Sequence, residues 1–432
     1  MDSLPRNHAP TLCIWKGVGG SSFIGGPTQG RCGRRGVFES GGRFVFACAA
    51  SGGILALRMA VQSDTFERAG IRDIAEAALG GERVTAEDGG RLFRCRDLTA
   101  LGILADAMRT RLHGDRATYI RNRYINYSNI CILDCQFCAF ARRRREPGAW
   151  EYTVPEIVEL ARKAAAENIT ELHIVGGLHP GLPFDYYLTM MRELRLAVPG
   201  VHLKAFTAIE IRHLAERIAR RPIPEVLAEL RDAGLDSLTG GGAEIFDAGV
   251  RDRICRGKET AEEWLAVHRE WHRMGGRSTC TMLYGHIETA EQRADHLDRL
   301  RTLQDETGGF TGFIPLPFQP EENRLAHVPR CTGFEDLRAI AVSRIMLDNV
   351  PHITAYWIGL GLPMAQIALS FGADDLHGTI MEEHIFHMAG AESPRAVTVS
   401  LLEQVIRGAG KKPVQRDSHY DAVRHAGDFS AA

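Results

Sequence analysis

The chain has 432 residues, 44% of them hydrophobic, so it is long and apolar enough to bury the core of a barrel with appended segments. Its 52 basic and 54 acidic residues give a net charge of −2, which provides no basic field for binding nucleic acid. No run of about 18 or more apolar residues occurs, so we expect no membrane-spanning helix.

Residues 1–58 differ from the rest of the chain in composition. They are rich in Gly, Ser and Arg, and their apolar runs are short. A secretory signal peptide needs a longer apolar stretch after a positively charged start. We therefore expect residues 1–58 to be a disordered extension without a function of its own, unless translation starts at Met59.

Residues 59–118 are expected to form an N-terminal helical segment. Apolar residues recur at helical spacing in 66–79 and in 98–112, and a glycine pair follows the first of these runs. A shorter helix is predicted to begin near Thr85. These helices would cap one end of the main domain.

Residues 119–357 alternate short apolar segments with amphipathic ones, which is typical of βα units and a parallel sheet. The helix 154–167 has a clear start, because Thr153 can act as N-cap with Glu156 three residues on. Strands are predicted near 124–130, 171–176, 201–206, 235–239, 278–284, 311–315 and 353–357. The other helices are predicted near 184–197, 223–233, 261–274, 289–304, 335–349 and 362–371.

This order predicts an α/β protein whose core, residues 119–357, is a full or partial (β/α) barrel of the TIM type. Residues 358–432 would form a C-terminal segment that closes the barrel at the substrate end. In such barrels the ligand site lies at the carboxyl ends of the strands. The side chains that follow each predicted strand are therefore the candidate site residues.

Three cysteines follow the first predicted strand in a C-x3-C-x2-C spacing: Cys131, Cys135 and Cys138. Disulfide pairing would leave one of them over, and a structural zinc site would need a fourth ligand. Three thiolates suit a cubane iron–sulfur cluster with one iron left open for a chelating molecule. The alternative is a zinc site completed by a distant His or Cys. The remaining cysteines are interpreted as structural or incidental: Cys13, Cys32, Cys48, Cys95, Cys255, Cys280 and Cys331.

Glycines and carboxylates follow the next strands. Gly176 and Gly177 come after the second strand, where they form either a close approach to a ligand or only a tight turn. Glu210 follows the third strand, as an acceptor for a ribose or substrate hydroxyl or as a solvated residue at a helix start. Three glycines and Glu244 follow the fourth strand, and we interpret them as an approach to the cofactor or substrate.

Two further features concern the substrate. Arg142–Arg145 is either a solvated loop or a clamp for an anionic substrate, because Arg matches carboxylate geometry. The segment 372–390 is expected to line the substrate end of the barrel. Its histidines His384 and His387 can share a helix face, but a metal site there would need more ligands.

The cysteine spacing, with Phe137 just before the last cysteine, resembles that of the radical S-adenosylmethionine superfamily. The resemblance implies a [4Fe-4S] cluster whose open iron binds S-adenosylmethionine and whose electron cleaves it. It also implies that the glycine pair contacts the methionyl amino group and that Tyr284–Glu288 packs against adenine, although Tyr284 could instead be ordinary core. The expected cofactor-binding residues are Phe137, Phe140, Gly176, Gly177, Glu210, Glu244, Tyr284, Gly285 and Glu288.

Seven segments together resemble the aminodeoxyfutalosine synthase family of the futalosine route to menaquinone, over residues 62–420. They are NRYINYSNIC, ELHIVGGLHP, HLKAFTAIE, GGGAEIF, TMLYGHIET, LQDETGGF and GTIMEEHIFHMAGAE. The resemblance implies a transferase that joins the adenosyl group of S-adenosylmethionine to 3-[(1-carboxyvinyl)oxy]benzoate. The products would be aminodeoxyfutalosine, methionine and bicarbonate.

The proton-handling residues cannot be read from the motifs, and His286, Glu382 and His387 are the candidates. The implied partners are the enolpyruvyl benzoate and a low-potential electron donor such as flavodoxin or ferredoxin. A thiolate cluster also favours a reducing compartment, the cytoplasm. The competing hypotheses are a dehypoxanthine futalosine cyclase, a deazaflavin (FO) synthase-type enzyme, an RNA-modifying radical enzyme and a non-catalytic zinc protein.

Overall fold

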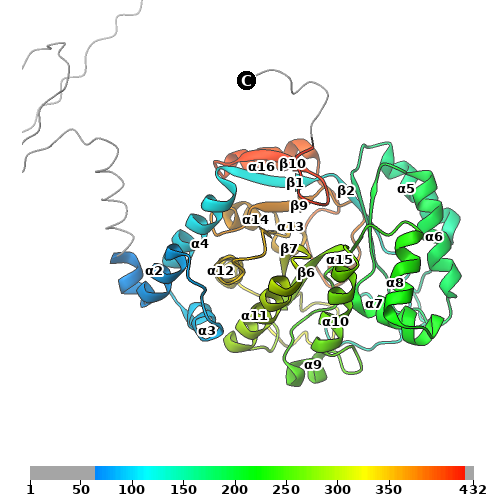
Figure 1. Cartoon of the computed structure of the whole chain (residues 1–432), viewed down its shortest axis with the longest axis horizontal. Coiled ribbons are helices and arrows are strands. Elements are labelled where there is room, and N and C mark those ends of the chain that lie inside the picture. The colour runs from blue at the N-terminus through cyan, green and yellow to red at the C-terminus, as the bar shows by residue number, and fades with distance from the viewer. Residues whose placement is uncertain (1–63, 424–432) are drawn as a thin grey trace, which may run out of the picture. The chain divides into compact units, whose positions relative to one another are not determined.

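The structure is a computed structural model, and it describes residues 64–423. The expectations for residues 1–58 and for Met59 lie outside the described residues. Within 64–423, none of the helices combines the length and the apolarity needed to cross a membrane. The described residues form a mixed α/β structure in which helices surround a curled parallel sheet (Figure 1).

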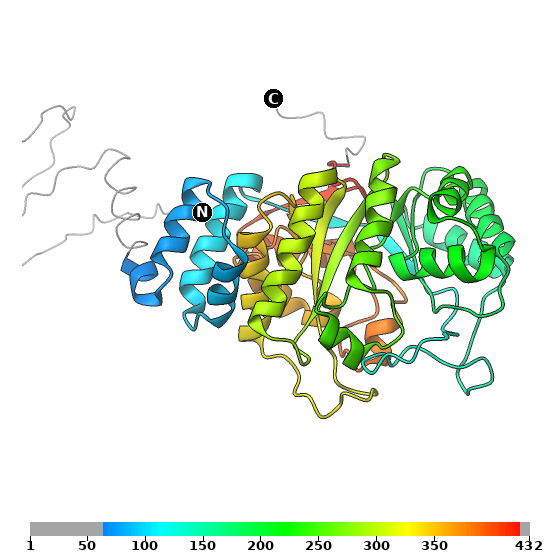
Figure 2. The same ribbon diagram turned by 60° about the horizontal axis from the view of Figure 1, so that its bottom comes forward.

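The N-terminal helices lie against the helical layer of the main domain. Residues 64–69 are helical and precede α2 (Arg72–Gly80), α3 (Ala86–Arg94) and α4 (Leu98–His113). The side chains of Thr85 and Asp97 cap α3 and α4 by accepting backbone N–H groups. In Figures 1 and 2, α3 packs on α11 (Ala290–Thr307) and α4 packs on α12 (Gly333–Met346). The helices predicted for this segment are therefore confirmed within residues 64–113, whereas residues 116–118, predicted to belong to the same helical segment, lie in a strand (Arg116–Ile120).

The main sheet has seven parallel strands in the order β2-β3-β4-β5-β6-β7-β8, so each strand pairs with the next one in the chain. This is the topology of a partial barrel, as predicted. The strands are β2 (Asn122–Ile125), β3 (Glu171–Ile174), β4 (His202–Ala205), β5 (Ser237–Leu238), β6 (Arg277–Tyr284), β7 (Phe310–Pro317) and β8 (His352–Ile353).

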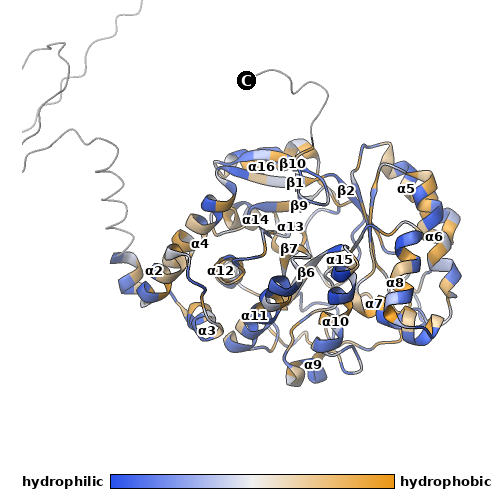
Figure 3. Ribbon diagram, in the orientation of Figure 1, coloured by the Kyte–Doolittle hydropathy of each residue, from blue (hydrophilic) through white to orange (hydrophobic). Residues whose placement is uncertain are grey.

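Helices join the strands and cover the outside of the sheet. They are α5 (Val154–Ala165), α6 (Phe184–Ala197), α7 (Ala208–His213), the π-helical η1 (Leu214–Ala219), α8 (Ile223–Asp232), α9 (Ala248–Ile254), α10 (Ala261–Arg273), α11 and α12. Thr153 and Glu156 form the predicted capping box of α5. Orange and blue both occur along α5, α6 and α8 in Figure 3, as expected for helices with one face on the sheet.

A second sheet, which the sequence analysis missed, completes the structure. Its strands β1 (Arg116–Ile120), β9 (Asp375–Gly378) and β10 (Lys412–Arg416) run parallel in the order β10-β1-β9. A bridge between Thr354 and Asp375 connects it to the end of β8. The remaining helices are α13 (Trp357–Leu360), α14 (Leu362–Ala368), α15 (Ile385–Met388) and α16 (Val399–Gly408).

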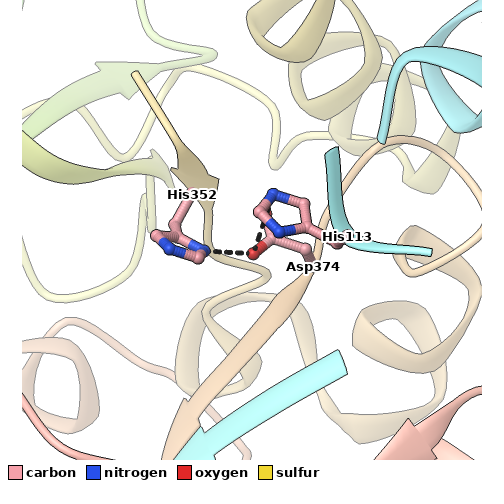
Figure 4. A group of neighbouring side chains, drawn as sticks. All are labelled: His113, His352 and Asp374. Carbon is pink, nitrogen blue, oxygen red and sulfur yellow. Dashed lines mark hydrogen bonds and ion pairs between the residues drawn. The ribbon is translucent and has the colours of Figure 1, made fainter. Parts of the chain in front are cut away.

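A polar cluster ties α4 to the start of β8 and β9 (Figure 4). His352 Nδ1 lies 2.5 Å from Oδ2 of Asp374, and His113 Nε2 lies 3.6 Å from the same oxygen. Arg344 donates a hydrogen bond of 2.5 Å to the other oxygen, Oδ1. Burial would raise the pKa of Asp374, but the hydrogen bond from His352 and the charge of Arg344 outweigh it and lower the pKa to about 2. Both carboxylate oxygens of Asp374 are therefore engaged. We interpret the cluster of His113, Arg344, His352 and Asp374 as a structural link between these elements, and we call it the latch.

Candidate active site

A cavity of about 290 Å³ lies inside the curled sheet and reaches the carboxyl ends of its strands. Nine of the residues expected to hold the cluster or bind the cofactor line this one cavity, and so do the three glycines that precede Glu244. The nine are Cys131, Cys135, Phe137, Cys138, Phe140, Gly176, Gly177, Glu210 and Glu244. The cavity is therefore the candidate active site.

The three cysteines lie on a long loop between β2 and α5, which backbone hydrogen bonds fix in place. Cys131 N donates to Arg142 O at 3.0 Å, and Gln136 N donates to Ile254 O at 2.7 Å. Arg143 donates from its side chain to the carbonyl of Cys131 at 2.7 Å. Because β2 ends at Ile125, the expected strand to residue 130 was too long, and its second half belongs to this loop.

The glycine pair after β3 lies where no side chain fits. A Cβ at Gly177 would lie 2.5 Å from the carbonyl oxygen of Ile130 and 3.0 Å from Cβ of Cys131. A Cβ at Gly176 would lie 2.5 Å from the ring of Tyr127. Glycine at both positions therefore lets the end of β3 pack directly against the cysteine loop.

Glu210 is buried and hydrogen-bonded on both oxygens. Oε1 accepts from Tyr127 Oη at 2.7 Å and from Gly176 N at 3.0 Å, whereas Oε2 accepts from Thr207 N and Oγ1 at 2.8 Å. Burial raises the pKa of this carboxyl, although these hydrogen bonds oppose the change. Glu210 thus stands at the start of α7, in a capping box with Thr207, but it is buried and not solvated as one interpretation held. It also accepts the backbone N–H of Gly176 in the glycine turn.

Glu244 lines the cavity near the cysteines and is paired with Lys258, which was not predicted from the sequence. Lys258 Nζ contacts Glu244 Oε1 and lies 5.9 Å from the ring centre of Phe137. Burial opposes the charge of Lys258, but Glu244 and Glu259 outweigh it and raise the pKa. Lys258 stands in a short turn after α9, and no periodicity or motif distinguishes it from a surface lysine.

The three cysteines fit the cluster that the sequence analysis predicts. Their side chains line one cavity from one short segment of this loop, and none of the cysteines in the described part of the chain is in a disulfide. Thiolates are the ligands that iron–sulfur clusters use, and the nearby Lys258 can offset part of their negative charge. Burial raises the pKa of the Cys135 and Cys138 thiols when they carry no metal.

The expected adenine segment after β6 does not line the cavity. Tyr284 is fully buried and donates from its hydroxyl to Asp336 at 2.7 Å, whereas its neighbour Leu283 lines the cavity. The reason is strand alternation, because successive side chains of β6 point to opposite faces. The adenine role expected for Tyr284 therefore needs correction: its side chain belongs to the packing between β6 and the helices.

His286 and Glu288 stabilise the turn after β6 instead of facing the cavity. Glu288 accepts the backbone N–H groups of Gly285 at 2.6 Å and His286 at 2.9 Å, and it pairs with the side chains of His286 and Arg293. Burial would raise the pKa of Glu288, but His286 and Arg293 outweigh it and lower the pKa. These partners leave neither side chain directed at the cavity, so the expected catalytic role of His286 is not supported by its position.

The other two expected catalytic residues also lie outside the cavity lining. Glu382 is half-exposed and pairs with Arg123. His387 Nδ1 lies 2.7 Å from the backbone carbonyl oxygen of Glu383 and 3.1 Å from its Oε2, and Nε2 lies 3.0 Å from the carbonyl oxygen of Ser393. The hydrogen bond to the carboxylate of Glu383 raises the pKa of His387. In this segment it is Glu383, together with Ile385, Phe386 and Ala389, that lines the cavity.

None of the arginines 142–145 lines the cavity. Arg142 donates to the carbonyls of Ala139 and Ala141 at 2.7 and 2.9 Å, and the side chain of Arg144 is 62% exposed. The run therefore fits the alternative of a solvated loop. Arg142 and Arg143 also stabilise the cysteine loop through hydrogen bonds to its backbone carbonyls. The run does not fit a clamp on a substrate in this cavity.

The inner end of the cavity carries polar side chains from strand interiors. Tyr124 on β2, His173 on β3 and Lys204 on β4 stand at consecutive register positions across the sheet. His377 on β9 joins them, with Nε2 3.2 Å from the hydroxyl of Tyr124. We call Tyr124, His173, Lys204 and His377 the polar floor. The polar floor was not predicted from the sequence, because its side chains stand within strands and not beyond the strand ends.

Comparison with known families agrees with this arrangement. The model of the Radical SAM superfamily matches residues 125–300, and that of the CofH/MqnC C-terminal region matches residues 307–428. Among solved structures, methylornithine synthase has a TM-score of 0.63 at 17% identity, covering 79% of this chain and 97% of that one. This likeness concerns the fold alone.

Among curated proteins, the chain is similar to two aminodeoxyfutalosine synthases. It is 48% identical to that of Thermus thermophilus over 364 residues, which covers 82% of this chain and 98% of the relative. It is 46% identical to that of Streptomyces coelicolor, covering 82% and 94%. A 5-amino-6-(D-ribitylamino)uracil–L-tyrosine 4-hydroxyphenyl transferase of Methanopyrus kandleri is 40% identical, covering 74% and 88%.

Proposed function

The chain belongs to the aminodeoxyfutalosine synthase family of the Radical SAM superfamily, and from that membership we propose how the residues of its cavity carry out the reaction. The enzyme is a radical S-adenosylmethionine transferase. It joins the adenosyl group to 3-[(1-carboxyvinyl)oxy]benzoate and, with water, gives aminodeoxyfutalosine, methionine and bicarbonate. The observation that carries this conclusion is the 48% identity over nearly the whole length of a relative of that name.

Cys131, Cys135 and Cys138 would hold a [4Fe-4S] cluster with one iron open to S-adenosylmethionine. When bound, the cluster supplies the electron that cleaves the sulfonium. Gly176 and Gly177 would offer backbone groups to the methionyl end, because they leave the space that a side chain would fill. The cofactor roles proposed for Phe137, Phe140, Glu210 and Glu244 rest on their place in the same lining.

The chain itself contributes positioning and the exclusion of water. Glu210 connects the glycine turn to α7 through four hydrogen bonds and so fixes the turn beside the cysteines. Apolar side chains, among them Leu283, Ile314 and Phe318, form part of the cavity wall. A dry, rigid wall protects a reactive carbon until it meets the terminal carbon of the enolpyruvyl double bond.

Three further points belong to this proposal. A low-potential flavodoxin or ferredoxin would supply the electron. The reaction would take place in the cytoplasm, because a reducing compartment preserves thiolate clusters. Residues 119–357 would act as the core barrel, with the helices of 59–118 as its cap and residues 358–432 closing the substrate end, where Glu383 and Phe386 meet the cavity.

The test is an anaerobic incubation of the reconstituted enzyme with reductant, S-adenosylmethionine and the enolpyruvyl benzoate, read by mass spectrometry. We expect a product that contains the adenosine unit and has lost one carboxylate as carbon dioxide or bicarbonate. Cleavage of S-adenosylmethionine with unchanged benzoate would overturn the transferase and favour the cyclase or deazaflavin-type reaction. Bound zinc without any cleavage would favour the non-catalytic alternative.

A further inference from the structure

Lys204 is a buried cation whose ammonium has few partners. The residue is 8% exposed and lines the cavity from the interior of β4. Its Nζ lies 4.0 Å from Oε2 of Glu171, and within residues 64–423 it makes no hydrogen bond. An ammonium carries three donors, and burying it without hydrogen bonds is unfavourable. Burial lowers the pKa of Lys204, although Glu171 opposes the change.

The neighbouring histidine is also short of partners. His173 is paired in register with Lys204 across β3 and β4 and stacks on Tyr124, with ring centres 4.2 Å apart. Its Nδ1 is shielded from solvent and has no hydrogen-bond partner in the described part of the chain. Two nitrogen-bearing side chains with unused bonding capacity therefore stand side by side on the polar floor.

The other charges near the floor are already engaged. Arg416 donates twice to Asp375, at 2.6 and 3.0 Å. Glu171 accepts from Asn122 at 3.3 Å and approaches Lys204 only to 4.0 Å. Direct hydrogen bonds between an ammonium and a carboxylate are shorter, at about 2.7–2.9 Å. Lys204 can thus accept a second carboxylate partner from the cavity.

The two ends of the cavity differ in the charge they offer. Only two side chains with a fixed positive charge, Lys204 and Lys258, line it in the part of the chain that the structure describes. Lys258 is paired with Glu244 at the cysteine end. His173 stands three residues before Gly176 on an extended strand, which separates the floor from the glycine turn by roughly 10 Å along the strand.

We propose that Lys204, flanked by His173, binds the ring carboxylate of the benzoate substrate. This assignment rests on the reaction proposed above. The double bond must face the cysteine end, where S-adenosylmethionine is held, and the enolpyruvyl carboxylate sits on that double bond. The ring carboxylate lies at the other end of the substrate and remains in the product. A cation at the floor would therefore set both the orientation of the substrate and the selection of a ring that carries a carboxylate.

The experiment compares two substrates on three enzymes. The substrates are 3-[(1-carboxyvinyl)oxy]benzoate and 2-phenoxyacrylate, which lacks the ring carboxylate. The enzymes are the reconstituted wild type, Lys204→Met and the control Lys163→Met, whose lysine is exposed on α5. Adduct formation gives kcat/KM, and calorimetric titration of the unreduced enzymes with each substrate gives the affinity.

We expect Lys204→Met to lose about 10- to 100-fold in affinity and in kcat/KM for the benzoate, as for one charge-assisted hydrogen bond, with no loss for 2-phenoxyacrylate. Lys163→Met should match the wild type with both substrates. Equal losses with both substrates, or none with either, would overturn the assignment. Where 2-phenoxyacrylate gives no adduct, the affinities from the titration decide between these outcomes. If the wild type forms no adduct from the benzoate, the proposed reaction itself has failed.

Discussion

Replacing Gly177 by alanine is expected to impair cluster assembly through steric contacts with the cysteine loop. The new Cβ would lie 2.5 Å from the carbonyl oxygen of Ile130, 2.9 Å from its carbonyl carbon and 3.0 Å from Cβ of Cys131. Opening the shortest contact to the 3.4 Å of ordinary van der Waals contact requires a movement of about 0.9 Å. All three contacts fall on the cysteine loop, so that loop must shift.

The size of this shift separates its effect on activity from its effect on folding. Overpacking of one methyl group typically costs about 1–3 kcal/mol, which a chain of this size tolerates. A misplacement of about 1 Å at reacting groups lowers the rate by about 100-fold. Gly177→Ala should therefore remain folded but assemble less iron and sulfide and lose about 100-fold in kcat.

The assay measures iron and sulfide per chain, the visible absorbance of the cluster and product formation after anaerobic reconstitution. Gly200→Ala is the matched control, because nothing lies within 4 Å of its Cβ position. The control should behave as the wild type. Wild-type cluster content and activity in Gly177→Ala would refute the reasoning, since they would show that the loop and the glycine turn are not packed as described.

Three further predictions concern the cluster, the latch and the N-terminus. Cys135→Ala should abolish cluster assembly and activity without unfolding the chain. The control Cys280→Ala should keep both, because the buried side chain of Cys280 lies outside the cavity lining. Iron analysis and product assays check both variants. Asp374→Asn should lower the free energy of unfolding by about 3–5 kcal/mol in urea titrations, because it leaves Arg344 buried without its partner. The lowered pKa of Asp374 further predicts a stabilisation that is present above about pH 4 and lost as the pH falls towards 2. If the free energy of unfolding of Asp374→Asn depends on pH in the same way as that of the wild type, this prediction is contradicted. Deleting residues 1–58 should leave kcat and KM unchanged, and a large loss would show that this segment has a role.

The cysteine end of the cavity could be predicted because its signals are local in the sequence. The cysteine spacing, the glycine pair and the Thr-x-x-Glu capping pattern each lie within a few residues. Parallel βα order then brings such segments to one edge without any knowledge of side-chain contacts. Nine of the residues expected to hold the cluster or bind the cofactor consequently line one cavity.

The other residues of the site could not be predicted, because their positions depend on strand register and on contacts between segments that are far apart in the sequence. Tyr284 and Leu283 differ by one position, and a one-residue difference in a strand exchanges the two faces of the sheet. The second sheet has polar strands, such as Lys412–Arg416, which lack the apolar alternation that indicates a strand. Lys258 depends on a turn whose conformation no local pattern encodes.

Lys204 shows another reason why part of the site could not be predicted from the sequence, and the same residue bears on how the enzyme selects its reaction. A lysine between apolar residues in a short strand gives no sign of whether it points outwards or into the barrel. The structure places it inside, at the end of the cavity away from the cysteines. The chain is 40% identical to a transferase whose name describes a different reaction. If the polar floor determines substrate specificity, removing the charge of Lys204 should change which aromatic substrate the enzyme prefers, while the enzyme still cleaves S-adenosylmethionine. A loss of this cleavage would instead assign Lys204 to cofactor binding.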